Sequence, residues 1–515
     1  MGFNIAATAT IRSLSMLRVI GIVGAGAMGK GIAQLIAQSG FQVLLFDSIP
    51  EVADMAKQAL FVQWDQLEQK QKITPHVAAT ARSHLHVVEV LEAMHVCDLV
   101  IEAIVEKLDV KQQLFHQLDQ IVKDECILAT NTSSLSVTAI AAGSRLPSRV
   151  AGLHFFNPVP LMKVVEVING LLTAAHVPPL LQALINDTGH AAVFAKDTPG
   201  FIVNHAGRGY VTEALRILQE NVADFTEIDQ IMRGAAGFRL GPFELMDLTG
   251  LDVSHPVMES IYHQYYEEPR YRPNYIAAQR VQAGVLGRKT GQGFYSYPPV
   301  SEAPLLPQET VWQGRIWLSP ENPLALDALH DLCERIDIVV DYGHLPAADA
   351  VAVVSPDGED VSTCVARLGL NPRRTIGIDS LNACHGHLTL MLNPATDLKL
   401  AQGLQLRCAQ HGMPATLIQD SAGFVVQRVL ATIINIACDI VQQGICSPQD
   451  LDQAVLAGLA YPFGPLAWGD KLGASRILSV LRNMQDSTGD PRYRPSPWLV
   501  RRAQLGLSLL HVAER

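Results

Sequence analysis

The chain has 515 residues, 48% apolar and 17% charged, with a net charge of −11 and a pI of about 5.8. This length exceeds a single core and predicts two to four domains, and the acidic balance argues against a nucleic-acid partner. The eight cysteines form no C-x-x-C pair. We therefore expect free thiols in a reducing, cytoplasmic setting and no metal site.

The chain begins with a segment that we interpret as a non-functional extension, residues 1–17, rather than as a transit peptide. No apolar run reaches the roughly 18 residues that a membrane helix needs. The most hydrophobic helical stretch, "VLATIINIACDIV" at 429–441, is interrupted by polar residues. We predict a buried core helix there, and no membrane partner.

Residues 17–47, "LRVIGIVGAGAMGKGIAQLIAQSGFQVLLFD", read as a strand, a glycine turn, a helix and a second strand. Gly24, Gly26 and Gly29 form G-x-G-x-x-G, in which the backbone can approach a pyrophosphate at a helix N-terminus. Asp47 ends the second strand, where it would accept from ribose hydroxyls and repel a 2′-phosphate. This pattern predicts a dinucleotide site that prefers NAD to NADP.

Further strands are predicted at 85–88, 98–103, 126–130 and 149–155, with helical patterns between several of them. This alternation predicts a mostly parallel, doubly wound α/β sheet of the Rossmann type over residues 18–196. In "TNTSSL", Ser133 follows a strand end, where such sheets bind ligands. Ser133 could donate to a substrate oxygen, or it could merely belong to a helix cap that Thr132 or Ser134 could also provide.

The stretch "GLHFFNPVPLMKVVEV" places His154 and Glu166 on two apolar strands joined by a turn. A returning strand brings the two side chains together. A carboxylate fixes the tautomer of an imidazole and stabilises it when protonated. Although a core histidine with an incidental acid is the general alternative, beside a nicotinamide fold the pair suits alcohol oxidation, in which one group takes the hydroxyl proton.

From residue 197 the pattern becomes helical, and we predict an all-α domain over 197–297, in whose first turn Asn204 could bind the same substrate oxygen. We expect no strong strand before residue 330, and then a linker and small α/β segment over 298–409 without a nucleotide. "DTPGFIVN" at 197–204 returns as "DSAGFVVQ" at 420–427, and Asp229 and Asp247 return as Asp452 and Asp470, all 223 residues later. This register predicts a second, degenerate copy of the all-α domain over 410–515.

Seven ordered motifs now resemble those of the 3-hydroxyacyl-CoA dehydrogenases: "GAGAMGKGIA", "IEAIVE", "NTSSL", "AGLHFFNPVPLMKVVEVI", "DTPGFIVN", "GPFELMDLTGLD" and "GRKTGQGFY". The resemblance covers about 17–297 and recurs at 410–505. It implies that His154 is the general base, that Glu166 orients it, and that Ser133 and Asn204 bind the substrate oxygen. The implied NAD-binding positions are Gly24, Gly26, Met28, Gly29, Asp47, Glu106, Lys111, Ser133, Asn157 and Lys289. Lys70 is implied near the CoA phosphates, and so is Gln63, although it replaces a family serine.

The length and the duplicated domain resemble long family members that act on 3-hydroxyadipyl-CoA in phenylacetate breakdown. We therefore expect NAD-dependent oxidation of an acyl-CoA thioester, with 3-hydroxybutyryl-CoA as the alternative substrate. A dicarboxylic chain should need a cation or a hydrogen-bond donor at its far end, for which Arg208, Arg216 and Arg239 are unranked candidates. A non-enzymatic NAD-binding protein is the remote alternative. The two all-α copies are expected to form an internal pseudo-dimer, and a homodimer is also possible.

Overall fold

In the computed structural model the chain divides into two compact units, and each unit contains parts of both repeats. One unit consists of Met1–His205 and Gln443–Leu459, and the other of Ala206–Gln442 and Ala460–Arg515. The structure describes residues 17–298, 312, 314–382, 384 and 386–513. Apart from Leu17, the predicted N-terminal extension therefore lies outside the described residues.

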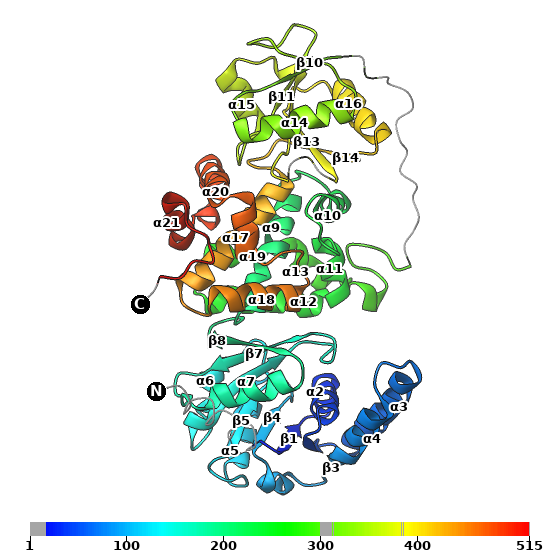
Figure 1. The fold of residues 1–515 in the computed structure, drawn as a ribbon, viewed down its shortest axis with the longest axis vertical. Helices are drawn as coiled ribbons and strands as arrows, with labels where there is room; N and C mark the ends of the chain where they lie inside the picture. Colours follow the sequence, from blue (N-terminus) through cyan, green and yellow to red (C-terminus); the bar gives the residue numbers. More distant parts are fainter. Residues whose placement is uncertain (1–16, 299–311, 313, 383, 385, 514–515) are drawn as a thin grey trace, which may run out of the picture. The chain divides into compact units, whose positions relative to one another are not determined.

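The first unit is built on an eight-stranded sheet of order β3-β2-β1-β4-β5-β6-β7-β8 (Figure 1). The strands are β1 (Val19–Val23), β2 (Gln42–Phe46), β3 (Leu85–Val87), β4 (Leu99–Glu102), β5 (Ile127–Thr130), β6 (Val150–Phe155), β7 (Val164–Asn169) and β8 (Ala191–Lys196). All neighbours are parallel except β6 and β7. The predicted doubly wound sheet is thus confirmed, with an antiparallel hairpin where His154 and Glu166 lie.

Helices with one apolar face connect these strands and cover the sheet. They are α2 (Ala27–Gln38), α3 (Pro50–Gln69), α4 (Pro75–His84), α5 (Leu108–Leu118), α6 (Val137–Ala141) and α7 (Val177–Asp187). The short helix α8 (Val203–Ala206) follows the last strand. In α2 the apolar face is fully buried, with Ile32 and Ile36 at 0% exposure. It packs in a core that includes the strand residues Ile20 and Ile22. Burial of such side chains, at about 1.5–3 kcal/mol each, holds the glycine turn against the sheet.

The all-α region that follows begins with α9 (Arg208–Gln219), α10 (Phe225–Gly234), α11 (Pro242–Thr249), α12 (Leu251–Gln264) and α13 (Tyr275–Gln282). Its repeat consists of α17 (Val425–Gln442), α18 (Pro448–Leu459), α19 (Pro465–Leu472), α20 (Ala474–Thr488) and α21 (Pro497–Leu505). Helix α17 is long and apolar enough to span a membrane by composition alone, but 89% of its span is buried inside the protein. The prediction of a core helix at 429–441 is confirmed.

Between the two all-α regions lies a six-stranded sheet of order β10-β9-β11-β12-β13-β14. Its strands are β9 (Ile316–Leu318), β10 (Val340–Asp341), β11 (Val351–Val354), β12 (Thr375–Ile378), β13 (Leu388–Leu392) and β14 (Ala415–Ile418). Its helices are α14 (Pro323–Arg335), α15 (Val361–Leu368) and α16 (Leu398–Gln410). Between residues 197 and 330, the described part of the chain contains one strand, the three-residue β9. It is too short to give a periodic signal, and the expectation that no strong strand occurs there is met.

This second sheet repeats part of the first, strand by strand. Strand β12 pairs antiparallel with β13, and β13 parallel with β14, as β6, β7 and β8 do. The paired residues His154 and Glu166 correspond to the paired Ile378 and Leu390, each 224 residues later. The duplication therefore includes the half of the Rossmann sheet that carries the His–Glu pair, with both polar residues replaced by apolar ones.

The two copies exchange equivalent segments. In the first unit, the Lys196 N–H at the end of β8 donates to the Ile445 carbonyl at 2.9 Å, and α18 packs on β7 and β8. In the second unit, the Gln419 N–H after β14 donates to the Val222 carbonyl, also at 2.9 Å. Lys196 and Gln419 differ by 223 in number, and so do Val222 and Ile445. Each sheet is thus completed by the all-α region of the other copy.

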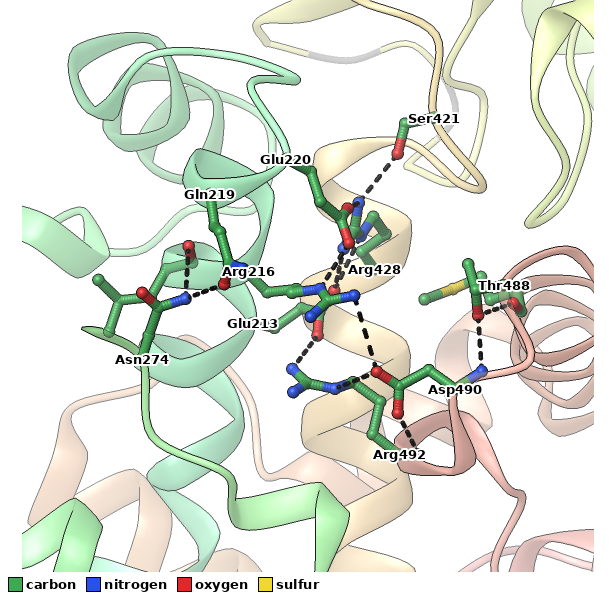
Figure 2. A network of polar contacts seen from close by, with 12 residues as sticks. Glu213, Arg216, Gln219, Glu220, Asn274, Ser421, Arg428, Thr488, Asp490 and Arg492 are labelled. Atoms are coloured by element: carbon green, nitrogen blue, oxygen red, sulfur yellow. Dashed lines mark hydrogen bonds and ion pairs between the residues drawn. The ribbon is translucent and has the colours of Figure 1, made fainter. Parts of the chain in front are cut away.

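Within the second unit, α9 and α17 pack together around a buried ionic network (Figure 2). The Arg428 guanidinium donates to Glu213 at 2.8 Å, to Glu220 at 2.6 Å and to the Tyr493 hydroxyl at 3.0 Å. Burial alone would lower the pKa of Arg428, but Tyr493, Glu213 and Glu220 raise it overall. Ile436 stands 223 residues after Glu213, so the network is not symmetric. If two copies of the first all-α region packed together in this way, the buried carboxylate of Glu213 would lack Arg428 as its partner. An unpaired buried charge would strongly destabilise such an assembly.

Candidate active site

The glycine turn between β1 and α2 has the shape that a pyrophosphate requires. Gly24 has φ of +103°, and a Cβ there would lie 2.5 Å from the Ala103 carbonyl oxygen. A Cβ on Gly29 would collide with the Gly24 carbonyl, which shows how closely the helix packs on the turn. A Cβ on Gly26 would meet no atom within 4 Å, and Gly26 is the N-cap of α2 without a side-chain cap. Open space beside uncapped amides fits the phosphates of a dinucleotide.

Asp47 follows β2 and lies against this glycine turn. One carboxylate oxygen accepts from the Ala25 N–H at 2.8 Å, and the other accepts from the Ile49 N–H at 3.0 Å. Each carboxylate oxygen has a further lone pair, so both can still accept from a ribose hydroxyl. Asp47 therefore links the shape of the turn to the position where a ribose would lie.

Lys111 and Glu106 form a charged cluster at the carboxyl ends of β4 and β5. Lys111 is only 1% exposed and contacts Glu102 at 2.6 Å and Glu106 at 3.2 Å. Glu102, itself 0% exposed, also accepts from the Thr130 hydroxyl at 2.7 Å. Sequence reasoning missed Glu102 and Thr130 as the residues that hold Lys111. The sequence does contain a sign of this pair, because Glu102 ends the otherwise apolar strand β4. A carboxylate in such a strand is expected to be buried, and a buried charge requires a partner.

Glu106 organises the "NTSSL" loop. Its Oε1 accepts from the Thr132 hydroxyl at 2.6 Å and from the N–H groups of Ser133 at 2.9 Å and Ser134 at 3.2 Å. Burial acts to raise the pKa of Glu106, but Lys111 and the loop donors hold it below its usual value. The loop is thus fixed by a carboxylate that stays ionised at neutral pH.

His154 and Glu166 face each other across the β6–β7 hairpin, and the predicted juxtaposition is present. His154 Nδ1 lies 2.6 Å from Glu166 Oε2, and the side chains are 6% and 0% exposed. Glu166 Oε1 accepts from the N–H groups of Ile202 at 2.9 Å and Val203 at 2.8 Å. Because Oε2 needs a donor, His154 carries its proton on Nδ1, and Nε2 keeps its lone pair. Among the described residues, no group bonds Nε2.

Ser133 and Asn204 are also brought together. Asn204 Nδ2 lies 3.4 Å from the Ser133 carbonyl oxygen, and Asn204 directly follows Val203 in α8. The helix after the "NTSSL" loop is capped by Ser136, which accepts from the Ala139 N–H at 3.1 Å. Ser136, and not Ser133, therefore provides the N-cap of this helix. Within the described chain no protein group bonds the Ser133 hydroxyl, which can turn to a ligand.

The other predicted site residues lie at more open positions. Met28 is half-buried at the start of α2, and Asn157 is exposed after β6. Gln63 is half-buried on α3, and Lys70 is the exposed C-cap of that helix. An open pocket of about 640 Å³ lies at the α3–α4 turn, lined by Asp65, Glu68, Gln69, Gln71, Lys72, Ile73, Thr74 and Pro75. Lys289 belongs to the second unit and pairs with Asp252 there.

Comparison with known proteins now adds to this geometry. A family model described as "3-hydroxyacyl-CoA dehydrogenase, NAD binding domain" matches residues 19–198. A second, "3-hydroxyacyl-CoA dehydrogenase, C-terminal domain", matches residues 200–297 and 423–508. The repeated match agrees with the predicted second copy of the all-α domain.

Three relatives show how far the likeness extends. The chain is 37% identical over 490 residues to the "3-hydroxyadipyl-CoA dehydrogenase" of Escherichia coli, covering 95% of this chain and 98% of the relative. A solved structure called "3-hydroxybutyryl-CoA dehydrogenase" from E. coli has 36% identity, the same coverage and a TM-score of 0.83. A "Probable 3-hydroxybutyryl-CoA dehydrogenase" of Deinococcus radiodurans is 42% identical over 277 residues, which is 54% of this chain and 99% of that protein.

The matched domains, the glycine turn and the His–Glu hairpin all indicate the same family. NAD is the cofactor that the first matched domain binds, and the residues at the turn fit it. The chain belongs to the 3-hydroxyacyl-CoA dehydrogenase family.

Proposed function

We propose that this protein oxidises 3-hydroxyadipyl-CoA to 3-oxoadipyl-CoA and that His154, Glu166, Ser133 and Asn204 carry the reaction. The observation that supports the chemistry most directly is the buried His154–Glu166 contact of 2.6 Å. The choice of acyl chain is supported by the end-to-end likeness to the E. coli protein named for that substrate. The same chemistry on 3-hydroxybutyryl-CoA is the second candidate, since other relatives carry that name.

In this proposal His154 Nε2 accepts the proton of the substrate hydroxyl. The chemistry that NAD supplies when bound is the acceptance of a hydride from the substrate carbon. Glu166 holds Nδ1–H at 2.6 Å and offsets the charge that the ring gains with the second proton. The Ser133 hydroxyl and the Asn204 amide donate to the substrate oxygen, and such donors are worth about 2.7–4 kcal/mol each in comparable sites.

Cofactor choice gives the first prediction. Asp47→Ala should weaken NAD binding and relax the exclusion of NADP, because it removes both the acceptor for the ribose hydroxyls and the charge that repels a 2′-phosphate. Asp47→Asn is the matched control, because its amide oxygen can still accept from the Ala25 N–H. It should relax the exclusion of NADP while preserving the glycine turn. Titration of both cofactors measures this, and a wild type that uses NADP as well as NAD would contradict it.

Three arginines are candidates to bind the distal carboxylate of an adipyl substrate, and their surroundings differ. Arg216 pairs with Glu220 at 2.5 Å and faces Asp490 at 3.8 Å, so its charge is already matched. Arg239 is exposed. Burial lowers the pKa of Arg208 to about 10, an effect that Tyr461 partly offsets. A guanidinium taken out of water attracts a carboxylate more strongly. Arg208 is only four residues after Asn204 in the chain, and we propose it as the specificity residue because of this proximity in sequence.

Substrate choice gives the second prediction. The wild type should have a kcat/KM at least about tenfold higher for 3-hydroxyadipyl-CoA than for 3-hydroxybutyryl-CoA, a ratio that measures differential transition-state binding. Arg208→Met should lower the adipyl value about tenfold or more and leave the butyryl value within about threefold, since only the longer chain has a distal charge. Arg239→Met is the matched control and should change neither. A wild-type preference for the butyryl substrate would establish the second candidate instead.

A further inference from the structure

The exchange of segments places part of the degenerate copy beside the proposed catalytic residues. Gln443–Leu459 comes from the second copy but belongs to the first unit. It runs along β8, which is the edge strand of the eight-stranded sheet, and the 2.9 Å bond from Lys196 to Ile445 fixes its register there. Helix α18 then covers β7, the strand that carries Glu166. An edge strand otherwise presents unpaired backbone groups, so this cover is a structural requirement.

Close contact between α18 and the start of α8 occurs at one glycine. A Cβ on Gly458 would lie 3.0 and 3.1 Å from the two Cγ atoms of Val203, and 3.4 Å from a Cγ atom of Val164 on β7. The absence of a side chain at Gly458 thus allows the helix to rest directly on Val203 and Val164. The buried face of α18 continues with Leu451, Ala454 and Val455, all at 0% exposure. Because close-packed contacts of this kind transmit displacement, a shift of α18 moves Val203.

Val203 connects this contact to the proposed chemistry in two ways. Its backbone N–H donates to Glu166 Oε1 at 2.8 Å. It also directly precedes Asn204 in the same turn of α8. Glu166 in turn holds the His154 ring through Oε2. A displacement of Val203 therefore changes the support of the general base and the position of the oxygen-binding amide together.

The same segment also places a thiol, that of the half-buried Cys446, within electrostatic reach of the Glu166 carboxylate. Burial raises the pKa of Cys446, and Asp450, Glu166 and Asp452 raise it further, so the thiol is neutral and within electrostatic reach of Glu166. Glu166 is 0% exposed, with its hydrogen bonds made to His154, Ile202 and Val203. In such a buried setting the His–Glu contact is strong.

We infer that Gln443–Leu459 of the degenerate copy is a positioning element for the first copy's active site, acting through the contact of Gly458 with Val203. This inference rests on the proposed function of His154, Glu166 and Asn204. The second copy lacks the catalytic pair, yet it supplies the surface against which that pair is held. Gly458 acts through Val203 and is a positioning residue, not a catalytic one.

The test adds a side chain at Gly458, where it meets Val203, and then removes the opposing methyl groups of Val203. Gly458→Val should lower kcat about 10- to 100-fold, the effect expected when catalytic groups move by up to about 1 Å, with NAD affinity within about twofold because the glycine turn is untouched. Gly458→Ala should lower kcat by a smaller factor, about threefold or more. Adding Val203→Ala to Gly458→Ala removes the methyl groups that the new Cβ would strike, and should restore kcat to within about twofold of Val203→Ala alone. Gln453→Val, at an exposed position of the same helix, is the matched control and should not change kcat.

The assay separates this inference from the proposed function. Turnover of 3-hydroxyacyl-CoA by the wild type tests the function, whereas the ratios among the variants test the positioning. Thermal unfolding is measured for every variant, and if Gly458→Val does not fold, the Gly458→Ala and Val203→Ala cycle decides. A folded Gly458→Val enzyme with a normal kcat, or a double variant that shows no recovery, would overturn the inference.

Discussion

His154→Ala should lower kcat by roughly 10² to 10⁴, the range that removal of a general base usually produces. Among the described residues no group hydrogen-bonds His154 Nε2, so no neighbouring base is placed to replace it, and the substrate proton would have to leave to water. NAD affinity should stay within about twofold, because the glycine turn and Asp47 are separate from the hairpin. Steady-state kinetics with an equilibrium NAD titration measures both quantities.

Glu166→Gln provides the matched comparison for this prediction. Glutamine keeps an oxygen for the Ile202 and Val203 N–H groups, but its amide NH₂ faces the Nδ1–H of His154 and cannot accept from it. The imidazole is then free to adopt the other tautomer, and the loss should again fall mainly on kcat. A His154→Ala enzyme with nearly normal kcat would disprove the assignment of the base.

Asn204→Ala should reduce kcat by about 10²-fold, whereas Gln427→Ala should leave it within about threefold. The two residues are structural equivalents, because each donates to a carbonyl 71 positions earlier in the chain. Asn204 contacts the Ser133 carbonyl at 3.4 Å, and Gln427 contacts the Pro356 carbonyl at 3.0 Å. The hairpin of the first copy carries His154, whereas Ile378 occupies the equivalent position in the second copy.

Gln427→Ala should instead destabilise the protein. Gln427 is 0% exposed, accepts from the Gly358 N–H at 2.9 Å and contacts Asp379 at 3.2 Å. Truncation leaves these buried groups without their partner, at about 1–3 kcal/mol each. Thermal unfolding measures this loss, and binding stoichiometry should show one NAD per chain. Equal kinetic damage from the two substitutions, or two NAD per chain, would contradict the assignment of catalysis to the first copy alone.

Local sequence patterns predicted the first half of the fold and the parts of the site that are continuous in the chain. The glycine turn follows from a strand, a helix and three spaced glycines, and the His154–Glu166 contact follows from a hairpin of known spacing. The residues that hold Lys111 were harder to predict from the sequence. Glu102 lies nine positions before Lys111, and neither its partner nor its burial has a periodic signature.

The sequence predicted a small α/β segment at the second sheet, but not that this sheet copies part of the catalytic one. In its copy of the hairpin, Ile378 and Leu390 stand where the polar pair would mark the motif, so the sequence retains only short apolar runs. Such runs do not distinguish a strand from a helix core. No local sequence pattern predicts that Gln443–Leu459 packs on the sheet of the other copy. The segment could contact either of two equivalent sheets, and only the tertiary fold decides between them.

The bond between Lys196 and Ile445 has a consequence for the synthesis of the protein. These residues are separated by 249 positions in the chain, so β8 emerges from the ribosome long before the segment that pairs with it. At about 5–20 residues per second, the delay is on the order of 10–50 s. Throughout this interval the edge of the catalytic sheet is available to neighbouring nascent chains. Loop closure over this separation also makes the last step of folding a slow, non-local one. Under the proposal that Gln443–Leu459 positions the catalytic residues, full activity is expected only after Leu459 has been translated.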